Sequence, residues 1–484
     1  MKIKSYLRAA EEKLADDQVL RAPSSYRSVW QLHFYAGLFV APFLLLLAIT
    51  GSLYLFDREF ENWWDRDFAK VQIEGKPMSL AMQESAVKAI DPASEVKRVV
   101  LPFAKDDTAK WLLQGMDGRK HEVFLNPYTL QVTAIRNPED APMAFIRRIH
   151  GTLLGGEIGS HIVELVACWT LVMLVTGLWM WWPKNWRVKG VLVPRTGAGG
   201  RRMWRDLHAV PSALVSVFVI LLVLTGLPWS AFWGVQLAKL GEYAPFVAPT
   251  PNFAAHAPAA HADHKTSSVQ KMPPAHNHMD HMQHMDATSD PAKAKVPWVI
   301  LNSPLPMGGE PLVGIAKVEP HLAMLDRAQF GEGVRIFYPD GPGGTFMINY
   351  IPDQAEGQRT IHVDPANGNM IDDIGWAQYS AGGRAIEWGT MLHIGRQYGW
   401  VNQLANLLVC LALIGAVISA LVHYWKRRPK GELAAPKVHK DARMPQGLKW
   451  GLIAMAIVFP LVGASMVPIL AYRFLKNRRA VQPA

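Results

Sequence analysis

Six histidines stand near the ends of long apolar segments. They form two groups: His33, His208 and His423, and His150, His161 and His393. Ionisable side chains at membrane depth are costly, so they are functional candidates by default. A b-type haem needs two neutral imidazoles that face each other across a helix bundle with apolar walls. We therefore expect these histidines to include haem ligands.

An internal repeat indicates which histidines pair. Leu32-His33 reappears as Leu207-His208, and the same offset places Thr50-Gly51 on Thr225-Gly226. A second offset relates His150 to His393 and Trp182 to Trp425. We predict that His33 pairs with His208 and His150 with His393, so that two b haems stack across the membrane. His161 and His423 have no repeat partner and remain alternative ligands.

A segment rich in histidine and methionine offers a second kind of metal chemistry. Its densest part contains His276, His278, Met279, His281, Met282, His284 and Met285. Thioether and imidazole together suit copper, and imidazole alone also suits zinc or nickel. The alternative is a low-complexity linker that binds metals only as any His-rich peptide does. The two cysteines, Cys168 and Cys410, fall inside apolar segments, which excludes a disulfide in the outer domains and a cysteine-based metal centre.

Several common functional motifs are absent. The sequence contains neither a phosphate-binding loop nor a dinucleotide-binding glycine motif after a strand. Electrons must then come from a membrane quinol or a separate cytoplasmic donor. The net charge is +10, and the basic residues lie beside apolar segments rather than on one soluble face. Nucleic acid is therefore not an expected partner.

Apolar runs of about 20 residues suit the bilayer's thickness and predict five transmembrane helices. The loops 183–207 and 426–447 are basic, so the positive-inside rule predicts that they are cytoplasmic. We expect the membrane to be the inner membrane of a bacterium. The N-terminal segment 1–31 is then also cytoplasmic, and 57–149 and 234–392 are periplasmic. The predicted spans are 32–56, 150–182 and 393–425 with their lead-ins, 208–233, and 448–472; the side of the tail 473–484 stays open.

The two periplasmic segments predict small α+β domains. In the first, 79–91 has a helical apolar stripe, and 97–101 and 110–114 alternate like strands. The second repeats this with a helix at 311–323 and strands at 333–338, 345–351 and 360–364. Each domain is predicted as a helix against its own antiparallel sheet. An insertion at 248–295 has a composition typical of disorder.

The fold class is therefore an α-helical membrane protein: a four-helix bundle from two pseudo-repeats, a fifth helix and two periplasmic α+β domains. The motifs LH at 32–33 and 207–208, IHG at 149–151, GLWMWWP at 177–183 and LHIGR at 392–396 resemble the PepSY-associated transmembrane family. The segments VFLNPYTLQV and IHVDPANGNM are similar to its PepSY domains. The resemblance covers about residues 30 to 425; the His/Met-rich insertion and the fifth helix depart from it.

This family includes inner-membrane ferric-siderophore reductases that hold two b haems by span histidines. The resemblance implies His33, His150, His208 and His393 as axial ligands, and a periplasmic ferric siderophore or another metal chelate as substrate. We expect a haem-dependent ferric-chelate reductase whose catalytic residues are unknown. The alternatives are a periplasmic copper reductase or copper-handling protein, and a non-enzymatic membrane-anchored PepSY module that binds or inhibits a partner.

Overall fold

The computed structural model describes residues 24–183, 185–243, 296–302, 306–326, 333–341, 343–427 and 444–479 of the chain. These residues belong to two compact units. Unit 1 comprises 1–52, 161–224 and 406–484, and unit 2 comprises 53–160 and 225–405. The His/Met-rich residues from His276 to Met285 lie outside the described residues, so their predicted metal site stays a prediction.

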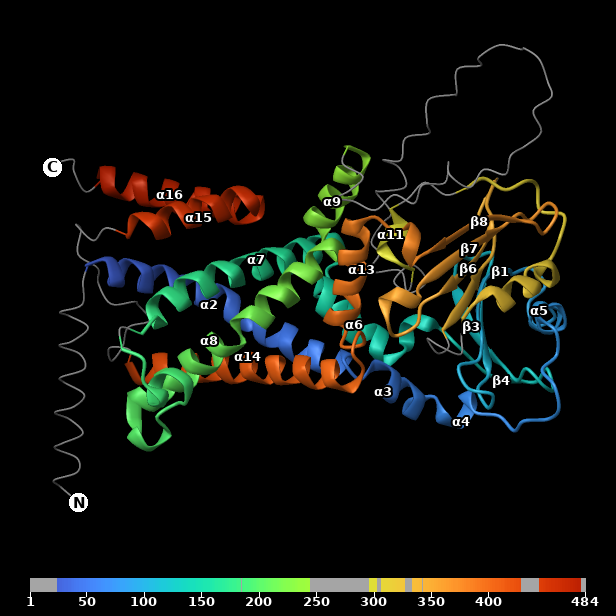
Figure 1. Cartoon of the computed structure of the whole chain (residues 1–484), viewed down its shortest axis with the longest axis horizontal. Helices are drawn as coiled ribbons and strands as arrows, with labels where there is room; N and C mark the ends of the chain where they lie inside the picture. Colours follow the sequence, from blue (N-terminus) through green and yellow to red (C-terminus); the bar gives the residue numbers. More distant parts are fainter. Residues whose placement is uncertain are drawn as a thin grey trace, which may run out of the picture. The chain divides into compact units, whose positions relative to one another are not determined.

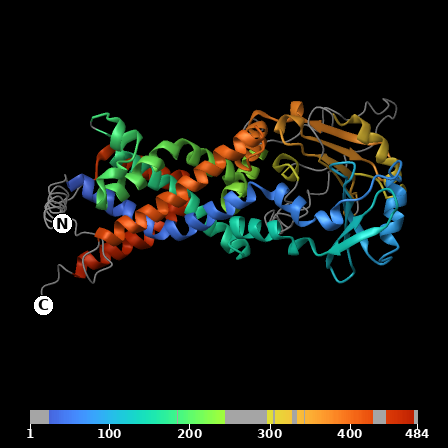
Figure 2. The same ribbon diagram turned by 90° about the horizontal axis from the view of Figure 1, so that it is seen from below.

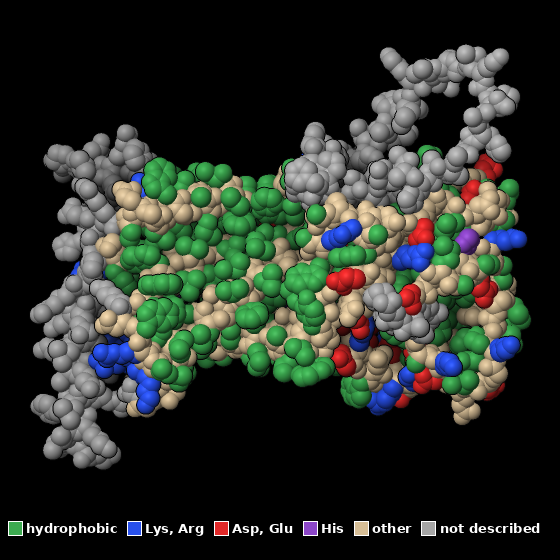
Figure 3. Space-filling view, in the orientation of Figure 1, with side chains coloured by type: hydrophobic (Ala, Val, Ile, Leu, Met, Phe, Trp, Pro, Cys, Tyr) green, Lys and Arg blue, Asp and Glu red, His purple; other side chains and the backbone are tan. Residues whose placement is uncertain are grey.

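Four described helices are long and apolar enough to cross a membrane. They are α2 (Ser24–Tyr54), α7 (Gly156–Trp181), α8 (Gly200–Gly226), which continues into η4 (Leu227–Trp229), and α14 (Trp400–Arg427). In the most apolar window of α2 only 17% of the residues are buried within the protein. On the face seen in Figure 3, hydrophobic side chains cover these helices. An apolar surface of this extent fits contact with lipid.

The predicted fifth span is not one helix. Residues 446–479 form α15 (Gln446–Val458) and α16 (Pro460–Arg479), which meet at an angle of 111°. Proline disfavours the helical conformation in the residue before it, and Phe459 accordingly has φ −113° and ψ 84°. A Cβ at Gly463 would lie 2.6 Å from the Ala456 carbonyl oxygen, so glycine permits the close return of the chain. An unbroken helix at 448–472 is therefore contradicted, and the predicted fifth crossing, if the pair is one span, is a broken one.

Eight strands of unit 2 form one antiparallel sheet in the order β4-β3-β2-β1-β5-β6-β7-β8. Their bounds are Glu95–Val100, Ala109–Gln114, Lys120–Leu125, Val132–Arg136, Val334–Phe337, Phe346–Tyr350, Arg359–Val363 and Met370–Gly375, from β1 to β8. We predicted two separate sheets, but β1 pairs with β5 and joins the two halves. Figure 2 shows the cyan first half continuing into the orange second half. This pairing satisfies two strand edges that would otherwise expose their backbone groups.

One face of the sheet carries the hydrophobic core of unit 2. Helix α5 (Leu80–Lys88), which Ser79 caps through its side chain, covers this face together with η7 (Ile315–Lys317) and η8 (Glu319–Met324) (Figure 1). Core residues such as Trp111, Ile336 and Ile348 are fully buried there. The helix predicted at 311–323 is instead these two short 3-10 segments, because Pro320 lacks the amide hydrogen that an α-helix needs in its interior.

Two short helices of unit 2 precede spans and end at histidines. Helix α6 (Pro142–Thr152) contains His150, and α13 (Ala381–His393) ends with His393. Left-handed residues follow each helix: Leu153 with φ 50°, and Gly395 with φ 78°. The remaining helical segments are α3 (Asp57–Trp64), α4 (Arg66–Ala69), η1 (Pro138–Asp140), η2 (Val188–Leu192), η3 (Thr196–Ala198), α9 (Ala231–Tyr243), α11 (Trp298–Leu301), η9 (Ala355–Gly357) and η10 (Trp376–Gln378).

Candidate functional site

His33 and His208 form a ring pair in unit 1. His33 lies on α2 and His208 on α8, and their ring centres are 6.2 Å apart with the ring planes at 71°. The sequence prediction paired these residues, and the structure brings them together although they are more than 170 positions apart in the chain.

Both imidazoles of this pair are held through Nδ1. His208 Nδ1 lies 3.0 Å from the Ala416 carbonyl oxygen, which can only accept, so Nδ1 carries the hydrogen. His33 Nδ1 lies 2.9 Å from Thr176 Oγ1. The Thr176 hydroxyl already donates to the Val172 carbonyl at 2.9 Å, so it accepts from His33. In this tautomer the Nε2 atom of each ring keeps the lone pair that a metal needs.

His150 and His393 form the corresponding pair in unit 2. Their ring centres are 6.4 Å apart and the ring planes lie at 73°, nearly the geometry of the first pair. His393 Nδ1 lies 3.1 Å from Thr225 Oγ1, at the end of α8. Trp229 Nε1 donates to Thr390 Oγ1 at 3.0 Å and fixes α13 against the segment that follows Thr225. Two repeat-related histidines thus meet again in similar geometry.

A Thr-Gly dipeptide supports one histidine in each unit. After Thr176, a Cβ at Gly177 would lie 3.1 Å from His33 Cε1; after Thr225, a Cβ at Gly226 would lie 3.3 Å from His393 Cε1. In each unit the threonine hydroxyl lies within hydrogen-bond distance of the ring Nδ1, while glycine leaves room for the ring edge. From the sequence, Thr225-Gly226 served only to align the repeat, and Thr176 was missed as a partner. The dipeptide Thr-Gly followed by leucine, at 176–178 and 225–227, was the available signal.

The ring separations fit a metal bound between two imidazoles. Two metal–nitrogen bonds of about 2.0 Å, and roughly 1.1 Å from each nitrogen to its ring centre, give ring centres about 6.2 Å apart. An ordinary edge-to-face ring contact spans the same range, so the distance alone does not define a metal site. The Nδ1 hydrogen bonds and the glycine clearances add the features that a ligand histidine requires. Among the described residues, no group of three or more metal-ligating side chains forms.

Two imidazoles without further protein ligands suit a metal whose other positions are filled by a macrocycle. Haem is the common case, since its axial ligands alone come from the protein. The residues at both pairs therefore fit a b-type haem, and His33, His208, His150 and His393 would hold it.

Charged groups occur on the helix of His393 and just after it. Arg396, three residues after His393, donates to both carboxylate oxygens of Asp57 at 2.9 and 2.7 Å. Glu387 on α13 is buried and accepts from the Val299 amide at 3.0 Å. Burial raises the pKa of Glu387 to about 7, against the effect of its hydrogen bonds. His393 thus lies on a helix that also carries a carboxyl group with a pKa near neutral.

The other predicted residues do not join these pairs. His161 lies on α7 and His423 on α14, and neither is a member of the two ring pairs. Cys168 and Cys410 are buried in α7 and α14 as free thiols, which confirms that they form no disulfide.

The comparisons with known proteins identify a family. The family described as the PepSY-associated TM region matches residues 30–427, most of the chain and all four apolar helices except the first residues of α2. No curated protein matches the chain. The chain is therefore a multi-pass membrane protein that belongs to the PepSY-associated TM region family.

Proposed function

We propose that this protein is a bacterial inner-membrane oxidoreductase that holds two b haems and reduces a ferric siderophore on the periplasmic side. His33 and His208 hold one haem, and His150 and His393 the other. When bound, each haem supplies a one-electron redox centre. The N-terminus is cytoplasmic, and the electron donor is a membrane quinol or a cytoplasmic protein.

The observation that carries this proposal is the repeated geometry of the two histidine pairs. Ring centres lie 6.2 and 6.4 Å apart, and the Nδ1 atoms of His33, His208 and His393 each have a protein partner. These partners orient the rings and fix the Nδ1–H tautomer at His33 and His208. Holding a neutral imidazole in this way raises its strength as a ligand.

The surroundings of the two pairs perform different tasks. Apolar helices around His33 and His208 exclude water, which sets the dielectric of the site and thereby its redox potential.

The substrate step is a one-electron reduction of ferric to ferrous iron. The ferrous ion has one positive charge less, so anionic chelator oxygens attract it more weakly and release it more readily.

The test is the reduced-minus-oxidised visible spectrum of the detergent-purified chain, with haem per chain counted as the pyridine haemochrome. We expect two b haems in the wild type and one each in His33→Ala and His393→Ala. His121→Ala, a substitution of the same kind on β3, is the matched control and should retain two.

Colourless wild-type protein would overturn the proposal and favour a binding module without redox chemistry. Loss of a haem in His161→Ala or His423→Ala, with none lost in His33→Ala, would reassign the ligands. Reduction of a ferric hydroxamate by the dithionite-reduced protein, followed as ferrous release to a chelating dye, tests the substrate step separately.

A further inference from the structure

Two arginines occupy equivalent positions on the central strands of the sheet. In the first half of the sheet, direct neighbours on β1, β2 and β3 are Val99, Trp111 and Val123. In the second half, direct neighbours on β5, β6 and β7 are Ile336, Ile348 and Ile361. Val99 therefore corresponds to Ile336, and the residues before them, Arg98 and Arg335, correspond to each other. Because Val99 pairs directly with Ile336, both arginines flank the junction of the two halves.

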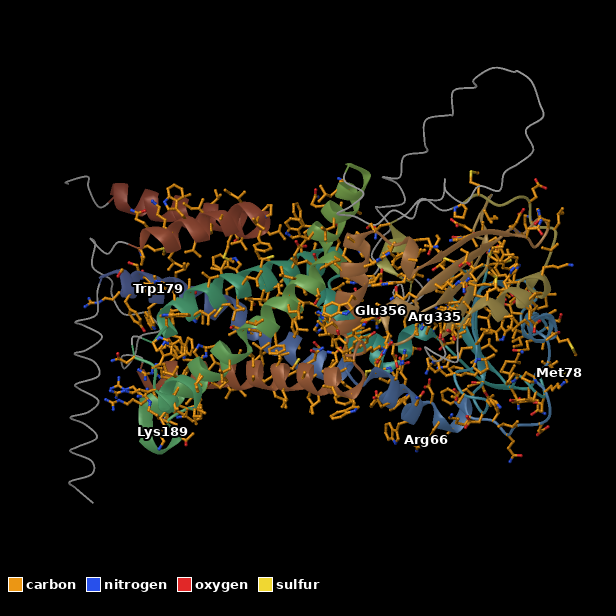
Figure 4. The ribbon with its side chains drawn as sticks, in the orientation of Figure 1. Arg66, Met78, Trp179, Lys189, Arg335 and Glu356 are labelled. Atoms are coloured by element: carbon orange, nitrogen blue, oxygen red, sulfur yellow. The ribbon has the colours of Figure 1, made fainter. Side chains whose placement is uncertain are left out.

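Both side chains lie on the face of the sheet opposite α5. Val99 and Ile336 belong to the core under α5, and neighbouring residues of a strand point to opposite faces. The exposed fractions of Arg98 and Arg335 are only 5% and 9%. Figure 4 shows Arg335 on the strands, on the side away from α5. Two repeat-related guanidinium groups are therefore buried on one face.

Polar groups without partners continue from Arg335 across the sheet. Asn349 lies directly opposite Arg335 on β6, and Thr360 lies opposite Asn349 on β7. Within the described part of the chain, Arg335 Nε and Nη1, both amide atoms of Asn349 and Thr360 Oγ1 make no hydrogen bond. Buried polar atoms are paired in nearly all native structures, so a row of three such side chains needs an explanation.

The charge around this row is positive. Arg58 and Arg396 are already paired, with Asp353 and Asp57 respectively. Arg335 has no ion pair among the described residues. Burial and, after it, the nearby charges of Arg98, Arg396 and Arg58 lower the pKa of Arg335 to about 9, against the opposite effect of Glu61. A negative charge at this position would relieve the repulsion.

We propose that Arg335, with Arg98 and Asn349, binds a carboxylate-type oxyanion on this face of the sheet. A guanidinium group binds a carboxylate through two parallel hydrogen bonds, and the Asn349 amide adds a donor beside it. The inference extends the proposed function, because the oxyanion belongs either to the metal chelate or to the carboxylates of the haem at His150 and His393. In the first case the substrates are anionic chelates.

The experiment measures calorimetric binding of citrate and ferric citrate to the detergent-solubilised full chain as purified. Arg335→Gln should weaken binding about 10- to 100-fold, the effect of losing a hydrogen-bonded charge. Arg66→Gln removes the same charge from an exposed position and should change nothing. Asn349→Asp supplies an internal carboxylate beside Arg335, so it should abolish citrate binding and raise the melting temperature, which keeps the test valid if Arg335→Gln fails to fold.

The outcomes distinguish the two sources. Citrate binding that depends on Arg335 identifies the chelate as the source. No citrate binding to the wild type, together with a shifted spectrum or lost haem in Arg335→Gln, identifies the haem carboxylates. If citrate does not bind and the haem spectrum of Arg335→Gln is unchanged, the oxyanion site is excluded. Arg335-dependent citrate binding to a haem-free wild type would retain this site and reject the haem proposal.

Discussion

The two histidine pairs share one geometry in different surroundings. In unit 1, His33 and His208 belong to helices of 31 and 27 residues. In unit 2, His150 and His393 belong to helices of 11 and 13 residues, and Arg396, which follows His393 by three residues, forms an ion pair with Asp57. On the face in Figure 3, hydrophobic side chains dominate over the span helices, whereas charged side chains are numerous over unit 2.

The support of the histidines is common to the two sites, because the Thr-Gly dipeptide recurs in both units. The charged groups near them differ. Near His208, the buried Asp206 pairs with Arg195 and Arg205, whereas near His393 the buried Glu387 has a raised pKa and Arg396 pairs with Asp57. Under the proposed function, the first pair, on long apolar helices, serves transfer within the membrane, and the second serves exchange with a charged substrate.

The largest effect is expected from filling the glycine clearances. Valine at Gly177 would place its Cβ 3.1 Å from His33 Cε1, and valine at Gly226 would place it 3.3 Å from His393 Cε1, with two further methyl groups beyond. Each ring must then move, so each variant should lose one of two haems. The pyridine haemochrome counts them, and the visible spectrum shows which component disappears.

Gly415→Val is the control, because no atom lies within 4 Å of a Cβ at Gly415 in α14. Loss of both haems in either glycine variant would show that the two pairs are not independent. Retention of both would show that the Thr-Gly dipeptides do not support the ligands.

A smaller effect is expected from Glu387 in unit 2, on the pH dependence of the free energy of unfolding. The folded pKa of about 7 lies above the ordinary value of 4.5, so Glu387 keeps its proton in the folded protein while the unfolded chain loses it. Its contribution to stability is present below pH 4.5 and is lost as the pH rises through 7. Relative to Glu387→Gln, the wild type should lose about 3 kcal/mol of unfolding free energy across that range.

Thermal unfolding of both proteins from pH 4 to 8 measures this difference. Glu310→Gln, at an exposed position of unit 2, should follow the wild type at every pH. Parallel curves for the wild type and Glu387→Gln would show that Glu387 ionises normally in the folded protein.

The smallest effect is expected from the threonine partners. Thr176→Val and Thr225→Val remove the hydroxyl partners at 2.9 and 3.1 Å from His33 and His393 Nδ1 but preserve the shape of the side chain. Loss of such a supporting hydrogen bond typically weakens metal affinity by about 10- to 100-fold. Haem transfer to excess apomyoglobin should therefore be faster for one haem in each variant.

Thr170→Val is the matched control on α7, because among the described residues the Thr170 hydroxyl donates to the Val166 carbonyl of its own helix and not to a histidine. If Thr170→Val accelerates haem loss as much as Thr176→Val does, the effect is one of helix packing rather than of ligand support.

Much of the fold followed from local sequence patterns. The four long apolar runs became α2, α7, α8 and α14, because a helix is the only way for a single segment to satisfy its backbone in lipid. The strands at 97–101 and 345–351 are found within a residue or two as β1 and β6. The 3-10 segments η7 and η8 were missed, although Pro320 marked the place, whereas the break at Phe459 lies where Pro460 already indicated a kink or split.

The sequence by itself determined the family, the apolar spans and the repeat that pairs His33 with His208 and His150 with His393. These depend on residue type and on spacing along one segment, which the chain carries locally. Only the tertiary structure decided that β1 joins β5 in one sheet, that Thr176 holds His33, and that Arg98 and Arg335 lie on one buried face. These are contacts between residues more than 100 positions apart, and no local pattern specifies which distant partner a strand edge or a polar side chain will meet.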